Sequence, residues 1–182
     1  MNKPQKIVTI SLLILAIVGI TYSFNKIQIE YYFKKKNSVF WSENAEITVE
    51  DFQGDINWNS KSTEWWFHEL YLRSTNLKDA EVIALFNKKK SWIKDTTDFK
   101  EVMRVQKLKF DLYESYARKC NNEMNKIKYR DDKFYSDLEK ILQKNFKELL
   151  ITEDSIHNSG LSRDETIKYW SKKIKKRLNK NK

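Results

Sequence analysis

Two histidines, His68 and His157, are the imidazole side chains available for metal or acid–base chemistry in this chain. A catalytic zinc ion is normally held by three protein ligands, so a carboxylate such as Asp154 or Glu114 would have to complete the set. His68 falls on a predicted strand and His157 in a predicted loop, and neither has a second histidine four residues away. The spacing argues against a zinc site, and a surviving metallohydrolase would need unusual ligands drawn from these four residues.

Other reactive arrangements are also missing from the sequence. With three glycines, the chain has no glycine-rich phosphate loop, no nucleophile elbow and no ordered catalytic triad. The single cysteine, Cys120, excludes an intramolecular disulfide and a cysteine zinc cluster. We expect it to be a small buried hydrophobe, because it lies on an apolar helical stripe. Asp111, Glu114 and Arg118 are expected to form local ion pairs, since Glu114 and Arg118 are four residues apart.

A long amphipathic helix must position most of these residues. The segment 91–125 predicts a short lead-in and then one helix, with Asp98 and Glu101 at the spacing of an N-cap and its capping box. Apolar side chains recur every three or four residues along it: Val105, Leu108, Leu112, Tyr113, Tyr116 and Cys120. On this pattern the segment is a core helix of a globular domain.

The same segment resembles the signature of a bacterial family of unknown function whose members are labelled predicted secreted zinc-dependent proteases. That family has a tryptophan-containing lead-in followed by a helix of the form HEQxHFDIxExxARxL. Here Ser91-Trp92-Ile93 is similar to the lead-in, and the second half of the helix motif is matched by Phe110-Asp111-Leu112, Glu114 and Ala117-Arg118. The resemblance implies a zincin-like fold, a zinc cofactor and peptidase activity.

The sequence departs from the family where the chemistry would be. In HExxH two histidines four residues apart share a zinc ion, and the glutamate acts as general base. This chain has Val105 and Lys109 at the histidine positions and Gln106 at the glutamate position. Valine has no lone pair, an amide takes up no proton at neutral pH, and lysine brings a positive charge to the place of a dication. We therefore expect zinc and catalytic activity to be lost.

Lys109 invites a more specific expectation. If the fold is kept, its ammonium would lie near the vacated metal position and could pair with Glu114, Asp154 or a nearby carboxylate. An unpaired, half-buried lysine would be costly, so such a pair would replace the charge of the ion. The alternative is that Lys109 extends to solvent along its aliphatic stem.

Two further blocks extend the resemblance along the chain. Residues 47–54 read as a short strand ending in a turn and are similar to an LTxxDFxG element of the family. A predicted loop at residues 151–161 is similar to a YDxETxHG segment, with Asp154, Ser155 and His157 at matching positions, and Trp170 matches a later tryptophan. The resemblance therefore marks Asp111, Glu114, Arg118, Asp154 and His157 as retained cleft residues, with no metal among them.

The N-terminal residues predict a membrane segment. Ile7–Phe24 is an apolar run close to the length that spans a bilayer, after a short basic start. Because no small-x-small cleavage site follows, we expect an uncleaved signal-anchor in residues 1–24, with a cleaved secretory signal as the alternative. Residues 25–39 form a connector whose aromatic and basic side chains suit a membrane interface or solvent. Flanking lysines leave the orientation open, and the resemblance to secreted proteins favours an extracytoplasmic, periplasmic domain.

The domain at residues 40–182 is expected to be α+β, with a small antiparallel sheet packed against about three helices. Trp66–Leu72 and Glu81–Phe86 predict a strand hairpin. After the helix in segment 91–125, a second helix is predicted from about Asp131 to Leu150 and a last one from Ser162 to Lys180. Ser162 and Glu165 have capping-box spacing.

The formal net charge of +10 raises the question of partners, because many lysines crowd the last helix. No nucleic-acid motif accompanies them, so nucleic acid is an improbable partner, and anionic lipid headgroups or plain solvation explain the charge better. Three functions remain from the sequence. The first is a non-catalytic, membrane-tethered domain that binds a partner or peptide in the old cleft. The others are a zinc peptidase with non-standard ligands and a structural envelope or lipid-surface protein that uses the basic C-terminal helix.

Overall fold

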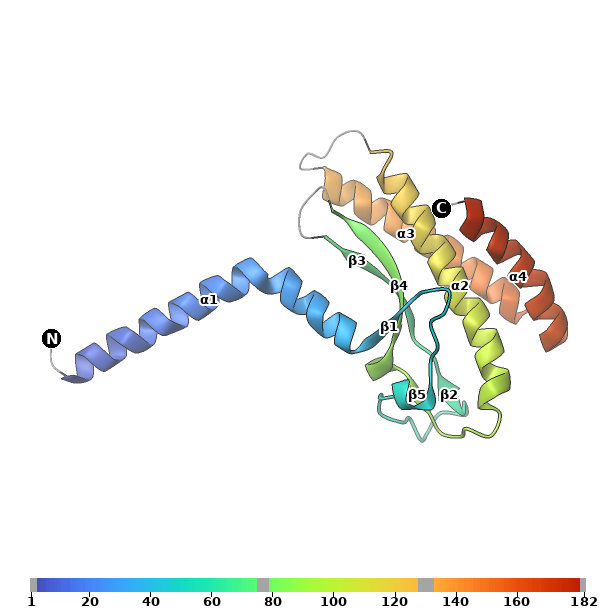
Figure 1. Ribbon diagram of the computed structural model, residues 1–182, viewed down its shortest axis with the longest axis horizontal. Helices are drawn as coiled ribbons and strands as arrows, with labels where there is room; N and C mark the ends of the chain where they lie inside the picture. Colours follow the sequence, from blue (N-terminus) through green and yellow to red (C-terminus); the bar gives the residue numbers. More distant parts are fainter. Residues whose placement is uncertain (1–2, 75–78, 128–132, 181–182) are drawn as a thin grey trace.

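The computed structural model describes residues 3–74, 79–127 and 133–180, and their side chains except those of residues 3–9 and 24. The described part is an α+β domain, as the sequence predicts, and it is preceded by a long helix that projects away from it (Figure 1). Its elements in chain order are α1 (Lys3–Lys36), β1 (Ser38–Phe40), the 3₁₀ turn η1 (Val49–Asp51), β2 (Glu64–Trp65), β3 (His68–Arg73), β4 (Glu81–Asn87), the 3₁₀ turn η2 (Lys88–Lys90), β5 (Trp92–Ile93), α2 (Phe99–Met124), α3 (Phe134–His157) and α4 (Arg163–Lys180).

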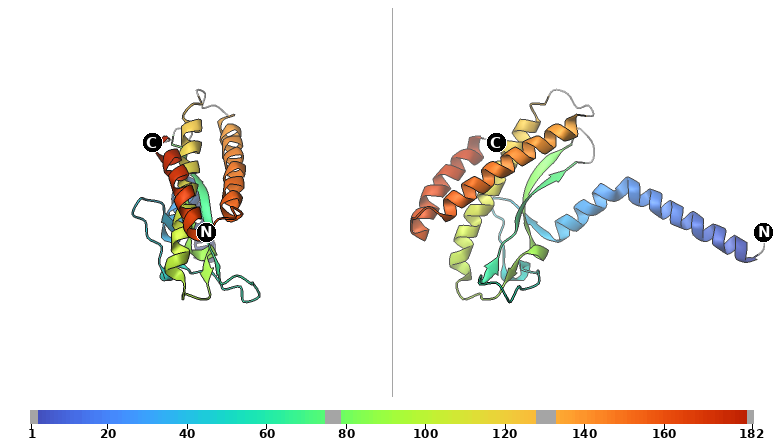
Figure 2. Two further views of the ribbon diagram at one scale, coloured as in Figure 1. Left: turned by 90° about the vertical axis from the view of Figure 1, so that its right-hand side faces the viewer. Right: turned by 180° about the vertical axis from the view of Figure 1, so that it is seen from behind.

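The main sheet is antiparallel with the order β1-β4-β3, and β2 pairs with β5 in a separate small ladder. The predicted hairpin is confirmed, with Leu70 opposite Ala84 in the β3–β4 register. Helix α2 packs against β4 and β3 and also contacts α3 and α4, which cover it on the side away from the sheet (Figure 2). The helix that carries the motif resemblance is therefore the centre of the domain.

The apolar stripe of α2 forms the core, as predicted. Leu108, Leu112, Tyr116 and Cys120 are all buried. Burial, with smaller effects from neighbouring charges, raises the pKa of the Cys120 thiol to about 12, so the thiol stays protonated and behaves as a hydrophobe. The side-chain amide of Asn121 forms two hydrogen bonds with the backbone of Val82. Its oxygen accepts one from the Val82 N–H at 2.7 Å, and its nitrogen donates one to the Val82 carbonyl at 2.9 Å. These contacts fix the position of α2 along β4 and hence that of every site residue on it.

Two local predictions are wrong. Helix α3 continues to His157, so residues 151–157 are helical and do not form a loop. No glycine or proline interrupts the helix there, and the chain leaves it only near Gly160, whose φ is +67°. The predicted start of this helix near Asp131 lies outside the described residues. Residues 47–54 contain η1 and no strand, because the Asp51 carboxylate accepts a hydrogen bond from the Thr48 N–H at 2.9 Å and closes a turn.

The two predicted capping boxes differ in outcome. Ser162 and Glu165 form theirs: the Ser162 N–H donates to the Glu165 carboxylate at 3.0 Å, and the Glu165 N–H donates to the Ser162 hydroxyl at 3.4 Å. Asp98 precedes α2 without a side-chain cap bond, because its backbone has left the extended conformation that capping needs. The Glu101 carboxylate pairs instead with Arg104 at 3.0 Å.

Helix α1 runs through the expected membrane segment and most of the expected connector, with a visible bend near its middle (Figure 1). Among the residues with described side chains, no single helix is long and apolar enough to cross a membrane. The helix bends by 67° between two pieces, Ile10–Ser23 and Asn25–Lys36. Taken together, these pieces have the length and the apolar composition that a membrane span needs. The apolar side chains of the first piece are exposed all round, without a packing partner in the described domain.

Candidate functional site

Lys109, which the resemblance aligns with the second histidine of the family motif, forms an ion pair. The Lys109 Nζ lies 3.2 Å from Oε1 of Glu153 on α3, and about four fifths of each side chain is buried. Oε2 of the same carboxylate accepts a hydrogen bond from the Tyr113 hydroxyl at 3.2 Å. The pairing that the sequence analysis expected for Lys109 is therefore present, with Glu153 in place of Glu114 or Asp154, and it joins α2 to the last turns of α3.

His68 lies next to this pair at the start of β3. It is buried, and its ring contacts the rings of Phe110 and Tyr113, each with centroids 5.3 Å apart. Its Nε2 has no hydrogen-bond partner among the described residues. Burial, with a smaller contribution from the Lys109 charge, lowers the pKa of His68 to about 3. The imidazole is therefore neutral at physiological pH, because a second positive charge would have no counter-ion in this apolar surrounding.

The other two motif positions also face the interior. Gln106 is buried, and its Oε1 has no hydrogen-bond partner among the described residues. Val105 is partly buried one residue earlier. An amide oxygen can accept a hydrogen bond, but it cannot remove a proton from water at neutral pH. Within residues 3–74, 79–127 and 133–180, no three side chains of His, Cys, Asp or Glu are grouped so that they could hold a metal ion.

Two of the five predicted cleft residues, Glu114 and Arg118, form the expected i, i+4 pair at 2.8 Å. Burial raises the pKa of Glu114, and the Arg118 charge opposes this. Asp111 does not join that pair. It accepts a hydrogen bond from the Trp41 Nε1 at 2.8 Å and pairs with Lys107 at 3.4 Å. The guanidinium of Arg118 lies over the Trp41 ring, so these residues share one side of α2, away from Lys109.

Asp154 and His157, the remaining two, lie on the last turn of α3 and are exposed. The Asp154 carboxylate accepts a hydrogen bond from the Asn158 side chain at 2.8 Å. His68 is buried against α2, so the structure does not assemble the two histidines and the two carboxylates into the ligand set that a surviving metallohydrolase would use. Glu153, which the sequence does not single out, is the residue of α3 that pairs with Lys109.

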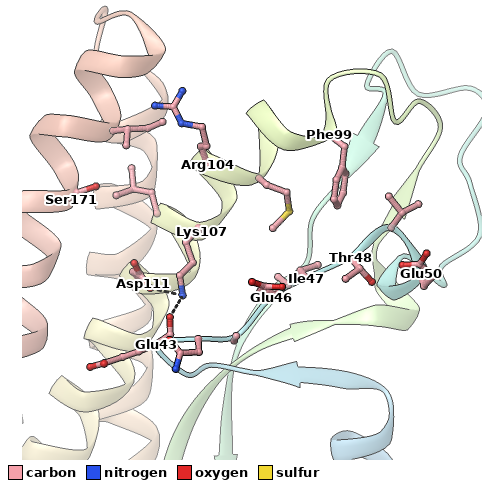
Figure 3. A pocket seen from close by; sticks show the side chains of 16 residues that line it. Glu43, Glu46, Ile47, Thr48, Glu50, Phe99, Arg104, Lys107, Asp111 and Ser171 are labelled. Carbon is pink, nitrogen blue, oxygen red and sulfur yellow. Dashed lines mark hydrogen bonds and ion pairs between the residues drawn. The ribbon is translucent and has the colours of Figure 1, made fainter.

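A groove of about 1010 Å³ lies on the side of α2 that carries Lys107 and Asp111 (Figure 3). Its walls are the segment 43–50, the first half of α2 and the side chains Ile167 and Ser171 of α4. Its lining combines apolar side chains with charges, and the apolar members are Ala45, Ile47, Val49, Phe99, Met103, Leu108 and Ile167. Of the five predicted cleft residues, Asp111 lines this groove, which is displaced from the position of Lys109.

The positively charged side chains around the groove are paired, whereas, in the part of the chain that the structure describes, most of the negatively charged ones are not. Its cations are already neutralised, because Arg104 pairs with Asp164 at 2.8 Å and Lys107 pairs with Asp111. The exposed carboxylates of Glu43, Glu46 and Glu50 make no ion pair with any described residue. A side-chain hydrogen bond from Thr48 lowers the pKa of Glu50, so this group stays ionised. The groove is therefore locally acidic on a chain whose net charge is +10.

Comparisons with protein-family models, curated proteins and solved structures find no match to this chain.

Proposed function

We propose that this protein is a membrane-anchored, non-catalytic domain of zincin-like ancestry that acts by binding a peptide segment of a partner protein. The observation that carries the proposal is the ion pair between Lys109 and Glu153 at the second histidine position of the motif. An ammonium held there by a carboxylate supplies the positive charge that a metal ion would bring. It also repels a dication, while leaving no Lewis acid to polarise a carbonyl or activate water.

The proposed loss of catalysis also rests on the lack of a base beside this pair. Gln106 stands where the motif has its glutamate, and the neighbouring imidazole of His68 is buried with a pKa of about 3. A group with so low a pKa holds no proton to donate at neutral pH and has little tendency to accept one. The described side chains around the Lys109–Glu153 pair thus pack against it and offer no group that transfers protons at neutral pH.

Anchoring rests on the exposed apolar residues of the first part of α1. A helix that exposes apolar side chains on every side is unfavourable in water and favourable in hydrocarbon. We place residues 7–24 in the cell membrane as a single-pass anchor and the domain on the extracytoplasmic, periplasmic side. The zincin-like ancestry and this location are parts of the same proposal, and each is supported by the motif resemblance.

The metal content of the purified full chain tests the loss of the cofactor. After loading with zinc and removal of unbound metal, we expect elemental analysis to find close to zero zinc per chain, because the described site offers an ammonium, a valine and an amide. The matched control is the V105H/Q106E/K109H variant, which restores the motif and is expected to retain more zinc than the wild type. A wild-type ratio near one would overturn the proposal and favour the alternative, a peptidase with non-standard ligands.

The acidic groove suggests the chemistry of the bound segment. A peptide that places apolar side chains against Ile47 and Met103, with basic residues toward Glu43 and Glu46, would satisfy both the apolar lining and the free carboxylates. Because the whole chain carries +10, a basic peptide is repelled at long range and is attracted near unpaired carboxylates such as those of this groove. Binding of such a peptide would therefore report on the groove and not on general charge.

A pair of labelled decapeptides tests this binding, with the full chain held in nanodiscs of zwitterionic lipid. We expect a peptide of alternating leucine and lysine to bind more tightly than one of alternating leucine and glutamate, by fluorescence anisotropy. The E43K/E46K variant should weaken binding of the lysine peptide at least about tenfold, since two close charge contacts reverse sign. The control replaces the exposed Glu139 of α3 with lysine. Equal weakening by both variants would contradict the assignment to the groove.

A further inference from the structure

The second part of α1 is docked on the sheet by specific contacts. The Lys34 ammonium lies 2.7 Å from a carboxylate oxygen of Glu69 on β3. The Tyr31 ring packs edge-on against Phe40 of β1 with centroids 5.9 Å apart, and the guanidinium of Arg73 lies over the same ring at 4.9 Å. These contacts come from both strands at the edges of the main sheet, so they fix how the helix meets the domain.

A hollow of about 550 Å³ remains between this part of α1 and the sheet. Its helix side presents the apolar and aromatic side chains of Tyr22, Ile29 and Phe33, and its far side presents Lys89 and Lys90 of η2. Both lysines are exposed, and neither pairs with a carboxylate of the described residues; the Lys90 ammonium lies 4.5 Å above the centre of the Phe67 ring. The hollow therefore joins an apolar wall to two free cations.

The other charges at the hollow are already balanced. The Lys34 ammonium is held by Glu69 and lies 5.0 Å from the centre of the Tyr71 ring, which also lines the hollow. The one carboxylate in the lining, Glu30, lies 3.9 Å from Lys26 on its own helix. The neighbouring Lys88 is paired with Asp51 at 2.7 Å. Two positive charges are left over, and an anionic phosphate group could contact both of them and offset part of their charge.

The bend in α1 sets the direction of its second piece relative to its first (Figure 1). The pieces Ile10–Ser23 and Asn25–Lys36 meet at 67°. When the first piece follows the bilayer normal, the second runs close to the plane of the surface, with exposed Tyr32 and Phe33 at the level where aromatic side chains are favoured. Lys35 and Lys36 at its end are exposed as well, and the hollow then opens among the headgroups.

We propose that the hollow between α1 and η2 binds the headgroup of an anionic phospholipid, with Lys89 and Lys90 on the phosphate and Ile29 and Phe33 against the glycerol and upper acyl chain. This inference rests on the membrane-anchoring part of the proposed function and is independent of the groove. It differs from a diffuse charge effect, because it assigns selectivity to two lysines and an apolar wall. The many lysines of α4 lie on another element and take no part.

Native mass spectrometry of the full chain in maltoside micelles tests the site, with equal amounts of phosphatidylglycerol and phosphatidylcholine of the same acyl chains. We expect phosphatidylglycerol to be retained about tenfold better, in line with two lysine contacts at a membrane surface. The K89Q/K90Q variant should bring this ratio close to one. The control variant K172Q/K176Q removes the same charge from exposed positions of α4 and should leave the ratio unchanged.

Each alternative outcome overturns the proposal in a recognisable way. Loss of selectivity in K172Q/K176Q would move lipid binding to α4, and equal loss in both variants would reduce it to net charge. Displacement of the lipid by an equal concentration of inorganic phosphate would show a site for soluble anions. Recovery of the chain in the membrane fraction, with no lipid selectivity, would leave the anchor in place and remove the site. Recovery outside the membrane fraction would instead contradict the anchor.

Discussion

Acidification is expected to destabilise this protein through His68. The imidazole is buried against Phe110 and Tyr113, and its folded-state pKa of about 3 lies far below the ordinary value near 6.5. As the pH falls, the unfolded chain therefore binds a proton before the folded one does. The stabilising effect of a neutral His68 is complete above pH 6.5 and is lost progressively between pH 6.5 and about 3.

The expected size is large for one side chain. Each pH unit in this window removes up to about 1.4 kcal/mol, and the whole shift corresponds to about 4–5 kcal/mol of the free energy of unfolding. Carboxylates titrate in the same range, so the measurement is a difference: urea unfolding of the wild type and of H68L at pH 7, 6, 5 and 4. We expect the two curves of free energy against pH to diverge, with the wild type losing more stability on acidification.

An exposed histidine supplies the control for this effect. His157 lies at the end of α3 in contact with solvent, so H157L should follow the wild type at every pH. Parallel curves for the wild type and H68L would show that His68 is not held neutral by burial. The same result would remove one support of the proposed loss of catalysis, because His68 would then be free to transfer protons near neutral pH.

The sequence predicts well those parts of the fold in which apolar residues recur with one regular spacing. The stripe of Leu108, Leu112 and Cys120 predicts both the helix α2 and its buried face. The β3–β4 hairpin follows from two runs of large apolar side chains separated by polar residues. In each case, burial of one face is the main stabilising effect, and the spacing of apolar residues records that face directly.

Where the structure departs from the prediction, local polar interactions or long-range contacts decide. Asp51 closes a 3₁₀ turn by binding the Thr48 backbone, and a β-like run of residues therefore forms no strand. Residues 151–157 are polar enough to suggest a loop, yet they stay helical because Thr152 and Ile156 are buried against the domain. A predicted helix that ends at Leu150 does not include Glu153, so the sequence does not place this residue on the helical face that meets Lys109.

The groove was equally hard to foresee, because it depends on three segments that meet only in the folded domain. Met103 and Ile167 come from different helices, and Ile47 comes from an irregular segment with no periodicity. The predicted metal position at Lys109 lies on one side of α2, whereas this groove lies on the other. Asp111 belongs to both the motif resemblance and the groove lining, since it follows Lys109 by two positions and so projects to the far side of the helix.

Replacing Lys109 by methionine is expected to lower the free energy of unfolding by about 3 kcal/mol, because the change leaves the largely buried carboxylate of Glu153 without its cation. The K140M variant is a matched control. Lys140 pairs with Asp137 at the same 3.2 Å separation but is largely exposed, so its loss should change stability by less than about 1 kcal/mol. Chemical unfolding of both variants at pH 7 measures the difference.

The double variant K109M/E153L separates a needed charge pair from mere packing. If the pair replaces the ion, removing both charges should restore most of the stability lost in K109M, because no uncompensated charge remains. The pKa of His68 should rise in K109M, since the Lys109 charge contributes to lowering it, and the acid window of the variant should start at the same pH but become smaller. Unchanged or increased stability of K109M would show that the ammonium is not a structural substitute for a metal ion. Lys109 would then simply extend to solvent, and the proposed loss of a metal site would rest on Val105 and Gln106 alone.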